Sequence, residues 1–404
     1  MKRPSPETAV QVRESVRKRA RAIAPDLIRW RRHLHQNPEL SFEEHETARF
    51  VTKILSEIPD IEITHPAGTS VVGVLRGARG GRMLAIRADM DALPITEENE
   101  EPFRSTRKGV MHACGHDGHT AMLLATARVF AEIRAEWPGE IRFLFQHAEE
   151  LFPGGGEEMV KAGVMDGVDA VIGTHLWSHL PSGQIAVTYG PMMAAPDVFH
   201  IRIKGLGGHA ARPQSSVDSI VLASEIVQHF QLLVSRETDP LDSLVVSVTQ
   251  FHAGTAHNVL PGEAELTGTV RTFNAALRNR IPERMEAILA GLCSAHRAQY
   301  ELRYEKGYRP VVNHDQVNHV VEAAARSLYG PDAIDFNQRN MGGEDFSAFQ
   351  EKAPGAFFYV GAGRPGSQRV YPHHHPRFTI DEGALVHGVE IFLTSGLHLL
   401  EEGF

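Results

Sequence analysis

The alternation of helical and strand-like apolar patterns along the first part of the chain predicts a layered α/β fold. Apolar residues recur at helical spacing in 26–36 and 42–57, and Asn37-Pro38 interrupts the run between them. Apolar runs typical of strands follow, separated by stretches of helical pattern. The predicted strands are 70–75, 83–88, 141–146 and 168–174, and the predicted helices among them are 120–137 and 157–162. We expect the polar residues before 20 to be frayed or only weakly helical.

The pattern changes near Gly190-Pro191, where a second arrangement begins. From there the predicted order is strand, helix, strand, strand, helix, strand, which is typical of a ferredoxin-like domain. These elements are 197–204, 216–235, 243–252, 264–273, 276–296 and 301–305. After Pro310 the α/β pattern resumes and ends in a helix at 383–400. We predict one α/β domain of residues 1–190 and 308–404, with an inserted domain of residues 191–307. A linear chain of three domains is the alternative.

Composition narrows the class of protein. The 404 residues carry a formal net charge of -9, and 42% of them are hydrophobic, which is ordinary for a globular protein. No apolar run approaches the roughly 18 residues needed to cross a membrane, and the basic N-terminal segment lacks the apolar region of a secretory signal. The mild acidity argues against nucleic acid as a partner. The only cysteines, Cys114 and Cys293, cannot form a disulfide framework, so we expect a reducing, cytoplasmic location.

Histidine is over-represented, with 23 copies, and several copies cluster with other side chains that bind metals. In MHACGHDGHT, residues 111–120, Cys114 and His116 stand two residues apart. A thiolate and an imidazole are ligands that zinc and other borderline metals prefer, and Asp117 is placed to orient an imidazole. A single histidine would more often be structural, but core packing does not explain this density of ligand types. The segment therefore predicts a metal site.

Polar residues also follow other predicted strands. Asp89 and Asp91 of RADMDALP share one side of an extended chain, although ordinary turn-forming residues would look the same. In QHAEE, residues 146–150, two adjacent glutamates could divide the roles of metal ligand and general base in metal-assisted hydrolysis, or form a solvated pair. His175 and the HHHP run at 373–376 supply further imidazoles, and only one of that run need bind metal. Because sites in open α/β sheets lie at strand ends, we expect these segments to converge.

Taken in order, the motifs of this chain resemble those of one family. They are RADMDALPI, HACGHDGHTAML, HAEE, GTHLW, GGHAARP, HNVLPGEAELTGTVRTF, GGEDFS and HHHPRF. The family is that of the di-metal amidohydrolases, which includes aminoacylases and carboxypeptidases, and the resemblance is to its branch of hippurate hydrolases and auxin–amino-acid conjugate hydrolases. It covers over nine-tenths of the chain. It implies a metallopeptidase-like catalytic domain with a central mixed sheet flanked by helices, and two divalent ions per subunit (Zn, Mn, Co or Ni).

The resemblance also implies roles for individual residues. The implied metal ligands are Cys114, His116, Glu150, His175 and His374, of which the last stands two residues before a proline, as it does in this branch. Glu149 would be the general base. Other branches carry a histidine where Asp89 stands, so Asp89 is not expected to be a ligand. Asp91 keeps the position of the supporting carboxylate.

The inserted domain resembles the lid of the family, which also joins the subunits into a homodimer or higher homo-oligomer. By this analogy His209, in a glycine-rich turn, would stabilise the oxyanion and could reach the site of the partner subunit. Asn258 and Arg271 would hold the carboxylate of the substrate. From pattern alone, Asn258 is equally well a turn residue and Arg271 a surface residue of a strand.

The implied activity is hydrolysis of the amide bond in small-molecule N-acyl-L-amino acids, either hippurate-like or N-acetylated, with no nucleic acid or membrane as a partner. A dipeptidase or carboxypeptidase and an N-acetyl-diaminopimelate deacetylase are the alternatives. A zinc-stabilised binding module is disfavoured because structural sites use closely spaced ligand pairs, whereas these ligands span about 260 residues. A Cys114 nucleophile with His116 as its base is disfavoured because two residues so close in the chain would struggle to reach in-line geometry.

Overall fold

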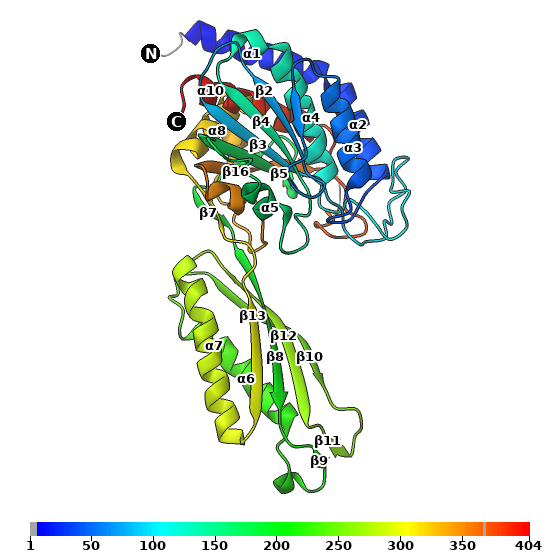
Figure 1. Cartoon of the computed structure of the whole chain (residues 1–404), viewed down its shortest axis with the longest axis vertical. Helices are drawn as coiled ribbons and strands as arrows, with labels where there is room; N and C mark the ends of the chain where they lie inside the picture. Colours follow the sequence, from blue (N-terminus) through cyan, green and yellow to red (C-terminus); the bar gives the residue numbers. More distant parts are fainter. Residues whose placement is uncertain (1–5, 367–368) are drawn as a thin grey trace. The chain divides into compact units, whose positions relative to one another are not determined.

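The computed structural model describes residues 6–366 and 369–404 and divides into two compact units (Figure 1). Unit 1 comprises the N-terminal part of the chain to Met192, together with Val312–Arg339 and Asp345–Phe404. Unit 2 comprises Met193–Val311 and the short segment Asn340–Glu344. The sequence analysis includes this short segment in the first domain, because it follows Pro310, where the α/β pattern resumes.

Unit 1 is built on an eight-stranded sheet in the order β1-β2-β4-β3-β5-β16-β6-β15. β3 is parallel to β4 and β5, and β5 is parallel to β16. β2 is antiparallel to both β1 and β4, and β6 is antiparallel to β16. The predicted central mixed sheet is therefore confirmed. Its strands are β1 (Glu62–Thr64), β2 (Val71–Arg76), β3 (Met83–Asp89), β4 (Glu140–Gln146), β5 (Ala170–Pro181), β6 (Ile185–Ala186), β15 (Ile334–Asp335) and β16 (Gly355–Gly363).

Helices cover both faces of this sheet. α4 and α10 contact each other as well as β3 and β5, and α8 packs against α10 and β16. Ala356 and Phe358 of β16 belong to the main hydrophobic core, whereas the ring of Phe357 between them packs against Phe346, immediately before α9. Because side chains alternate across a strand, α9 lies on the opposite face. The helices of unit 1 are α1 (Pro6–Ala22), α2 (Ala24–Gln36), α3 (His45–Ser56), α4 (His116–Glu132), α5 (Gly155–Lys161), α8 (Asp315–Tyr329), α9 (Ser347–Gln350) and α10 (Ala384–Glu401).

Two of these helices differ from the sequence-based expectation. α1 is a packed helix with Val16 and Ala20 buried, not a frayed segment, although residues 1–5 lie outside the described range. α4 begins at His116, four residues before the predicted start, since Gly115 at its N-cap adopts a left-handed conformation with φ of 101°. Glycine takes this conformation without steric cost. As a result, the first turn of α4 carries His116, Asp117 and His119 of the HACGHDGHT motif. None of the described helices is long and apolar enough to cross a membrane.

Unit 2 contains a four-stranded antiparallel sheet in the order β10-β12-β8-β13. α6 and α7 contact each other and this sheet, and a separate hydrophobic core lies between them. The side chains of Asp218 and Asn274 cap α6 and α7 at their N-termini. The βαββαβ order is that of a ferredoxin-like domain. The elements are β8 (Ala195–Lys204), β9 (Gly208–His209), α6 (Ser219–Ser235), β10 (Leu244–Ala253), β11 (Val259–Leu260), β12 (Glu263–Thr272), α7 (Ala275–His296) and β13 (Gln299–Glu305); β7 (Gly190–Met193) and β14 (Val311–Asn313) form a separate pair.

Candidate metal centre

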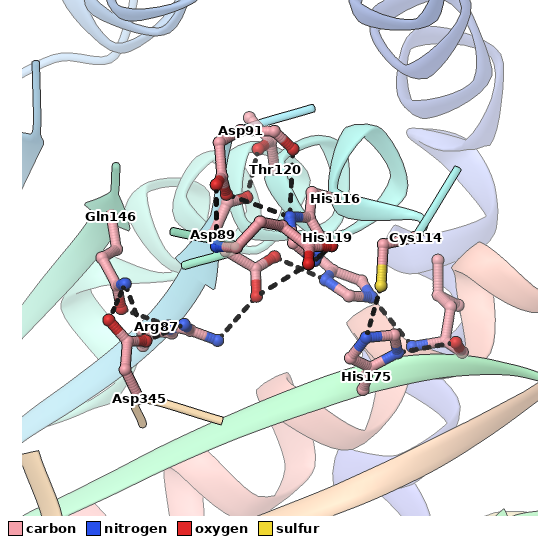
Figure 2. Close-up of polar contacts among 12 residues, drawn as sticks. Arg87, Asp89, Asp91, Cys114, His116, His119, Thr120, Gln146, His175 and Asp345 are labelled. Carbon is pink, nitrogen blue, oxygen red and sulfur yellow. Dashed lines mark hydrogen bonds and ion pairs between the residues drawn. The ribbon is translucent and has the colours of Figure 1, made fainter. Parts of the chain in front are cut away.

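The candidate site collects side chains from the ends of neighbouring parallel strands and from the first turn of α4 (Figure 2). β3 ends at Asp89, β4 ends at Gln146, and His175 lies on β5 just beyond its last pairing with β3 at Gly173. Parallel strands present their carboxyl ends at one edge of a sheet, where ligands usually bind. The segments that the sequence analysis expects to converge are therefore brought together here.

The side chains predicted to bind metal form one connected set. Cys114 Sγ lies 3.3 Å from His175 Nε2. Glu150 Oε1 lies 3.8 Å from His116 Nε2 and 3.3 Å from His374 Nε2. One ligand atom from each of Cys114, His116 and Glu150 lies within 4.8 Å of the others. Two ligands of a tetrahedral zinc ion stand about 3.4 Å apart, so these spacings suit atoms that share a small cation.

The hydrogen bonds of two histidines leave their Nε2 atoms available. His116 Nδ1 lies 3.0 Å from the carbonyl oxygen of Asp91, and His175 Nδ1 lies 2.8 Å from that of Leu176. A carbonyl oxygen only accepts, so both Nδ1 atoms carry a proton, and in a neutral ring Nε2 then has a free lone pair. Among the described residues, buried His116 Nε2 and Glu150 Oε1 have no hydrogen-bond partner. Two buried electron-pair donors that face each other without a partner fit a metal ion.

Electrostatics at the site favour a positive charge. Burial alone would lower the pKa of His116, but the carboxylates of Asp89, Asp91 and Glu150 raise it to about 10. Burial, together with the nearby glutamates, raises the pKa of the Cys114 thiol well above its usual value. Both shifts have the same origin, since several carboxylates crowd a region from which water is excluded. A divalent cation would be attracted by the same carboxylates and would keep Cys114 deprotonated as a thiolate.

The other two histidines of the HHH run contact other groups. His373 Nδ1 lies 3.2 Å from the carbonyl oxygen of Cys114, and its Nε2 accepts the N–H of Ser178 at 3.2 Å. Its ring also stacks on Trp177 at 4.6 Å between centroids. His375 Nδ1 accepts the N–H of Arg377, and its ring packs against Tyr371. Of the HHH run, His374 is the member whose ring nitrogen faces Glu150.

The aspartates near the centre differ in what they contact. Asp91 Oδ1 lies 3.2 Å from His116 Nδ1, as expected for a supporting carboxylate. Asp117, which the sequence analysis places against a ligand imidazole, instead contacts His35 Nδ1 and the guanidinium of Arg31, both at 2.8 Å. The reason is that Asp117 lies on the side of α4 that packs against α2. Asp89 lies 3.8 Å from His116 Nε2, and its oxygens also contact Arg87 and His119.

The turn that carries the two glutamates is held by a carboxylate that sequence reasoning missed. Ala148, just before Glu149, has a left-handed φ of 48°, and its N–H donates to Glu44 Oε1 at 2.8 Å. Glu44 also accepts the N–H of Phe42, another left-handed residue with φ of 68°, at 3.0 Å. Burial raises the pKa of Glu44, which is fully inaccessible to solvent. Its segment looks like the polar start of a helix, so no sequence signal marks it.

A second group that sequence reasoning missed surrounds Arg87. Its guanidinium donates to Gln146, Asp89 and Asp345 at 2.7 to 2.9 Å, and all four side chains are buried (Figure 2). Burial raises the pKa of Asp345 to about 6, although Arg87 and Gln146 oppose the shift. A carboxylate oxygen of Asp345 also lies within 4.8 Å of one from Glu149. Gln146 and Asp89 lie in segments that the sequence analysis considered, but no pattern linked them to Arg87 or Asp345, which appeared only as parts of the motifs RADMDALPI and GGEDFS.

The candidate residues of unit 2 do not form one cluster. His209 pairs with Val259, and Ala210 donates to the carbonyl oxygen of Asn258, so His209 and Asn258 lie close together. Arg271 lies near the other end of β12, half-buried, with Nε donating to Thr269. Since β12 begins at Glu263, eight residues at about 3.3 Å each separate the two ends by about 26 Å. A single small substrate cannot touch both ends of this unit.

The family model, the related sequences and the related structure found by comparison with known proteins agree with one another. The model of peptidase family M20/M25/M40 matches residues 85–395. An N-acyl-L-amino acid amidohydrolase of Geobacillus stearothermophilus is 59% identical over 304 residues, which cover 75% of this chain and 82% of the relative. An N-acetylcysteine deacetylase of Bacillus subtilis is 43% identical and covers 94% of this chain and 98% of the relative. The crystal structure of a dinuclear metal-binding peptidase of the M20 family from Bacillus subtilis has a TM-score of 0.82 and 38% identity, covering 94% of this chain and 99% of that one.

Glu44 accepts the N–H groups of Ala148 and Phe42 and so clamps the turn before Glu149. Substituting Glu44 should therefore lower the stability of the protein more than substituting the adjacent Glu43. Glu44→Ala should lower the free energy of unfolding by about 1–3 kcal/mol, because the buried N–H of Ala148 and the partly buried N–H of Phe42 lose their acceptor. Glu43→Ala is the matched control, since the Glu43 side chain is 74% exposed, and it should change stability by less than about 0.5 kcal/mol. Urea denaturation followed by circular dichroism measures both. Equal effects of the two substitutions would show that the clamp contributes nothing.

Proposed function

The chain belongs to peptidase family M20/M25/M40, and from this premise we propose that it is a metal-dependent amidohydrolase that cleaves N-acyl-L-amino acids to a carboxylate and a free amino acid. The observation that carries the proposal is the pair of buried atoms His116 Nε2 and Glu150 Oε1, which lie 3.8 Å apart and have no hydrogen-bond partner among the described residues. The relative named an N-acyl-L-amino acid amidohydrolase supports the substrate class. The dinuclear metal-binding peptidase supports two ions per subunit.

We assign the metal ligands to the residues whose lone pairs converge. They are Cys114, His116, Glu150, His175 and His374, a mixed sulfur, nitrogen and oxygen set that Zn, Mn, Co and Ni all accept. Divalent ions held by these residues would supply Lewis acidity, which would polarise an amide carbonyl and increase the acidity of a water molecule. Asp91 holds the His116 ring through Nδ1, which fixes the direction of Nε2.

Glu149 is proposed as the general base. It precedes the ligand Glu150 in the turn that Glu44 clamps, and its side chain is largely buried. In this role its carboxylate accepts a proton from the attacking water while the water oxygen bonds to the amide carbon. When the carbon–nitrogen bond breaks, the same proton passes to the departing amine, so the carboxylate is regenerated. The products are the free acid of the acyl group and the amino acid.

Unit 2 is proposed to complete the site in two separate ways. Arg271, with its bidentate guanidinium, suits the α-carboxylate of the substrate. His209 and Asn258 lie about 26 Å away along β12, so they would serve a different copy of the site. We therefore propose that unit 2 acts as a lid and a dimerisation domain, with His209 stabilising the oxyanion in the partner subunit. This arrangement requires a homodimer or a higher homo-oligomer.

A substrate panel tests the proposed activity directly. The purified enzyme, supplied in turn with Zn, Mn, Co or Ni, is offered N-acetyl-, N-benzoyl- and dipeptidyl-amino acids, each with its α-carboxylate free or amidated. We expect kcat/KM to be highest for an N-acyl compound with a free carboxylate, and chelation to abolish turnover. Preference for dipeptides would favour a peptidase, and preference for N-acetyl-diaminopimelate would favour that deacetylase. Turnover that survives complete metal removal would rule out the mechanism.

Glu149→Gln separates the base from the metal ligands. Glutamine keeps the shape of the side chain but cannot accept the proton, so kcat should fall by about 10²- to 10⁴-fold. Its metal content, measured by mass spectrometry, should stay at the wild-type value. Glu150→Gln is the matched comparison, and it should lose metal as well as activity. An active Glu149→Gln enzyme with normal metal content would show that another group acts as the base.

The HHH run offers a direct test of the ligand at residue 374. His374→Ala should lower the metal content of the purified protein, because its Nε2 is the one that faces Glu150. His375→Ala should retain metal, because its Nδ1 accepts the N–H of Arg377 and its ring packs against Tyr371. Metal content per subunit, determined by mass spectrometry after dialysis, measures both. Loss of metal in His375→Ala alone would show that His375, and not His374, is the ligand.

A further inference from the structure

We propose that His119 is a positioning residue that holds β5 beside α4, so that His175 of β5 reaches Cys114, and that His119 is not itself a metal ligand. It lies at the end of a buried hydrogen-bonded chain that starts at Asp345 and passes through Arg87 and Asp89 (Figure 2). The inference deepens the proposed function and rests on it in one respect, since the ligand role of His175 belongs to that proposal.

The two nitrogens of His119 are both engaged. Its Nδ1 lies 2.6 Å from Asp89 Oδ1, and its Nε2 accepts the backbone N–H of Leu176 at 2.8 Å. Because a backbone N–H can only donate, Nε2 carries no proton and Nδ1 donates to Asp89. The ring is therefore fixed in a single tautomer. A metal ion at Nε2 would have to displace the hydrogen bond of Leu176, which immediately follows His175.

The position of Leu176 matters because α4 and β5 touch there. Gly118 lies on the first turn of α4, and a Cβ atom added to it would meet Leu176 Cδ1 at 2.4 Å. The missing side chain allows the helix to approach the strand, and the His119–Leu176 hydrogen bond joins them at the same point. One residue earlier on β5, His175 Nε2 lies 3.3 Å from Cys114 Sγ. A shift of β5 along α4 would move His175 away from the thiol.

Asp89 is held in turn by the guanidinium of Arg87. Arg87 Nη1 donates to Asp89 Oδ2 at 2.7 Å, and Nη2 donates to Asp345 Oδ1 at 2.9 Å. Asp345 is fixed independently by the Gln146 amide and by the N–H of Gly156, both within 2.9 Å. Every side chain in this hydrogen-bonded series is buried, with relative exposure of no more than 1%. Buried networks of this kind hold their members rigidly when each group has a partner.

The tautomer of His119 can be measured without reference to activity. The full-length protein, labelled with ¹⁵N-histidine, is studied by long-range ¹H–¹⁵N correlation in the metal-free form and during titration with Zn²⁺. His119→Gln, which removes one set of signals, gives the assignment. We expect His119 to show a neutral ring protonated at Nδ1 both before and after zinc is added. A ring protonated at Nε2, or a nitrogen shifted by direct binding of zinc, would overturn the proposal.

A pair of variants tests the positioning itself. His119→Asn places its amide near the former Nδ1 and removes the acceptor of the Leu176 N–H, whereas His119→Gln places its amide near the former Nε2 and can keep that acceptor. We expect the Kd for Zn²⁺, from chelator competition, to rise by about 10- to 100-fold in His119→Asn and by less in His119→Gln. His179→Asn, an exposed position of the same strand, should leave it unchanged.

The outcomes separate this inference from the proposed function. An unchanged Kd in His119→Asn, with the wild-type fold by circular dichroism, would overturn the positioning role even if the enzyme is an active amidohydrolase. If His119→Asn does not fold, the tautomer of the wild-type protein still decides the question. A protein that binds no zinc, but whose His119 is protonated at Nδ1, would contradict the proposed function and leave His119 as a structural link between α4 and β5.

Discussion

Unit 1 is organised around buried side chains whose lone pairs face one another. Within the part of the chain that the structure describes, buried His116 Nε2 and Glu150 Oε1 have no hydrogen-bond partner, and carboxylates on several sides make this region strongly attractive to positive charge. An arrangement of this kind is costly unless a cation or a proton occupies it. The surrounding contacts, from the Glu44 clamp to the guanidinium of Arg87, hold these groups in place against their mutual repulsion. The fold thus stabilises a concentration of negative charge that a smaller or more open domain could not hold.

The sequence predicted the parts of the site that depend on residue type and strand order. Cys114 and His116 stood out because ligand-type side chains cluster within ten residues, and Glu150 because it follows an apolar strand, but it was the family resemblance that implied their roles as ligands. The layered α/β pattern of unit 1 and the βαββαβ order of unit 2 were predicted from local periodicity, whereas the mixed character of the central sheet was implied by the family resemblance. The first turn of α4 was missed because its polar residues resemble a loop, and only Gly115 in a left-handed conformation shows where the helix begins.

The residues that hold the ligands were harder to find from sequence. Glu44 acts on Ala148 across about a hundred positions of the chain, and Arg87 acts on Asp345 across more than two hundred. Neither contact leaves a periodic signal, because each joins residues that are far apart in the sequence and meet only in the folded chain. Asp117 illustrates the same point, since its spacing suggested one imidazole and the packing of α2 supplied another. Motifs therefore identify ligands more readily than the groups that orient them.

The place of Asp345 in the chain has a consequence for how the protein can vary. It is the first residue of unit 1 after Asn340–Glu344, which belongs to unit 2, and it is bound at once by Arg87, Gln146 and Gly156. Because these hydrogen bonds begin at the first residue after the crossing, an inserted or deleted residue there would displace Asp345 from its buried partners. The turn around Leu241, whose side chain is 96% exposed, has no such attachment, and exposed turns accept insertions readily. Variation in length should therefore accumulate at exposed turns of unit 2, while the crossing before Asp345 keeps a fixed length.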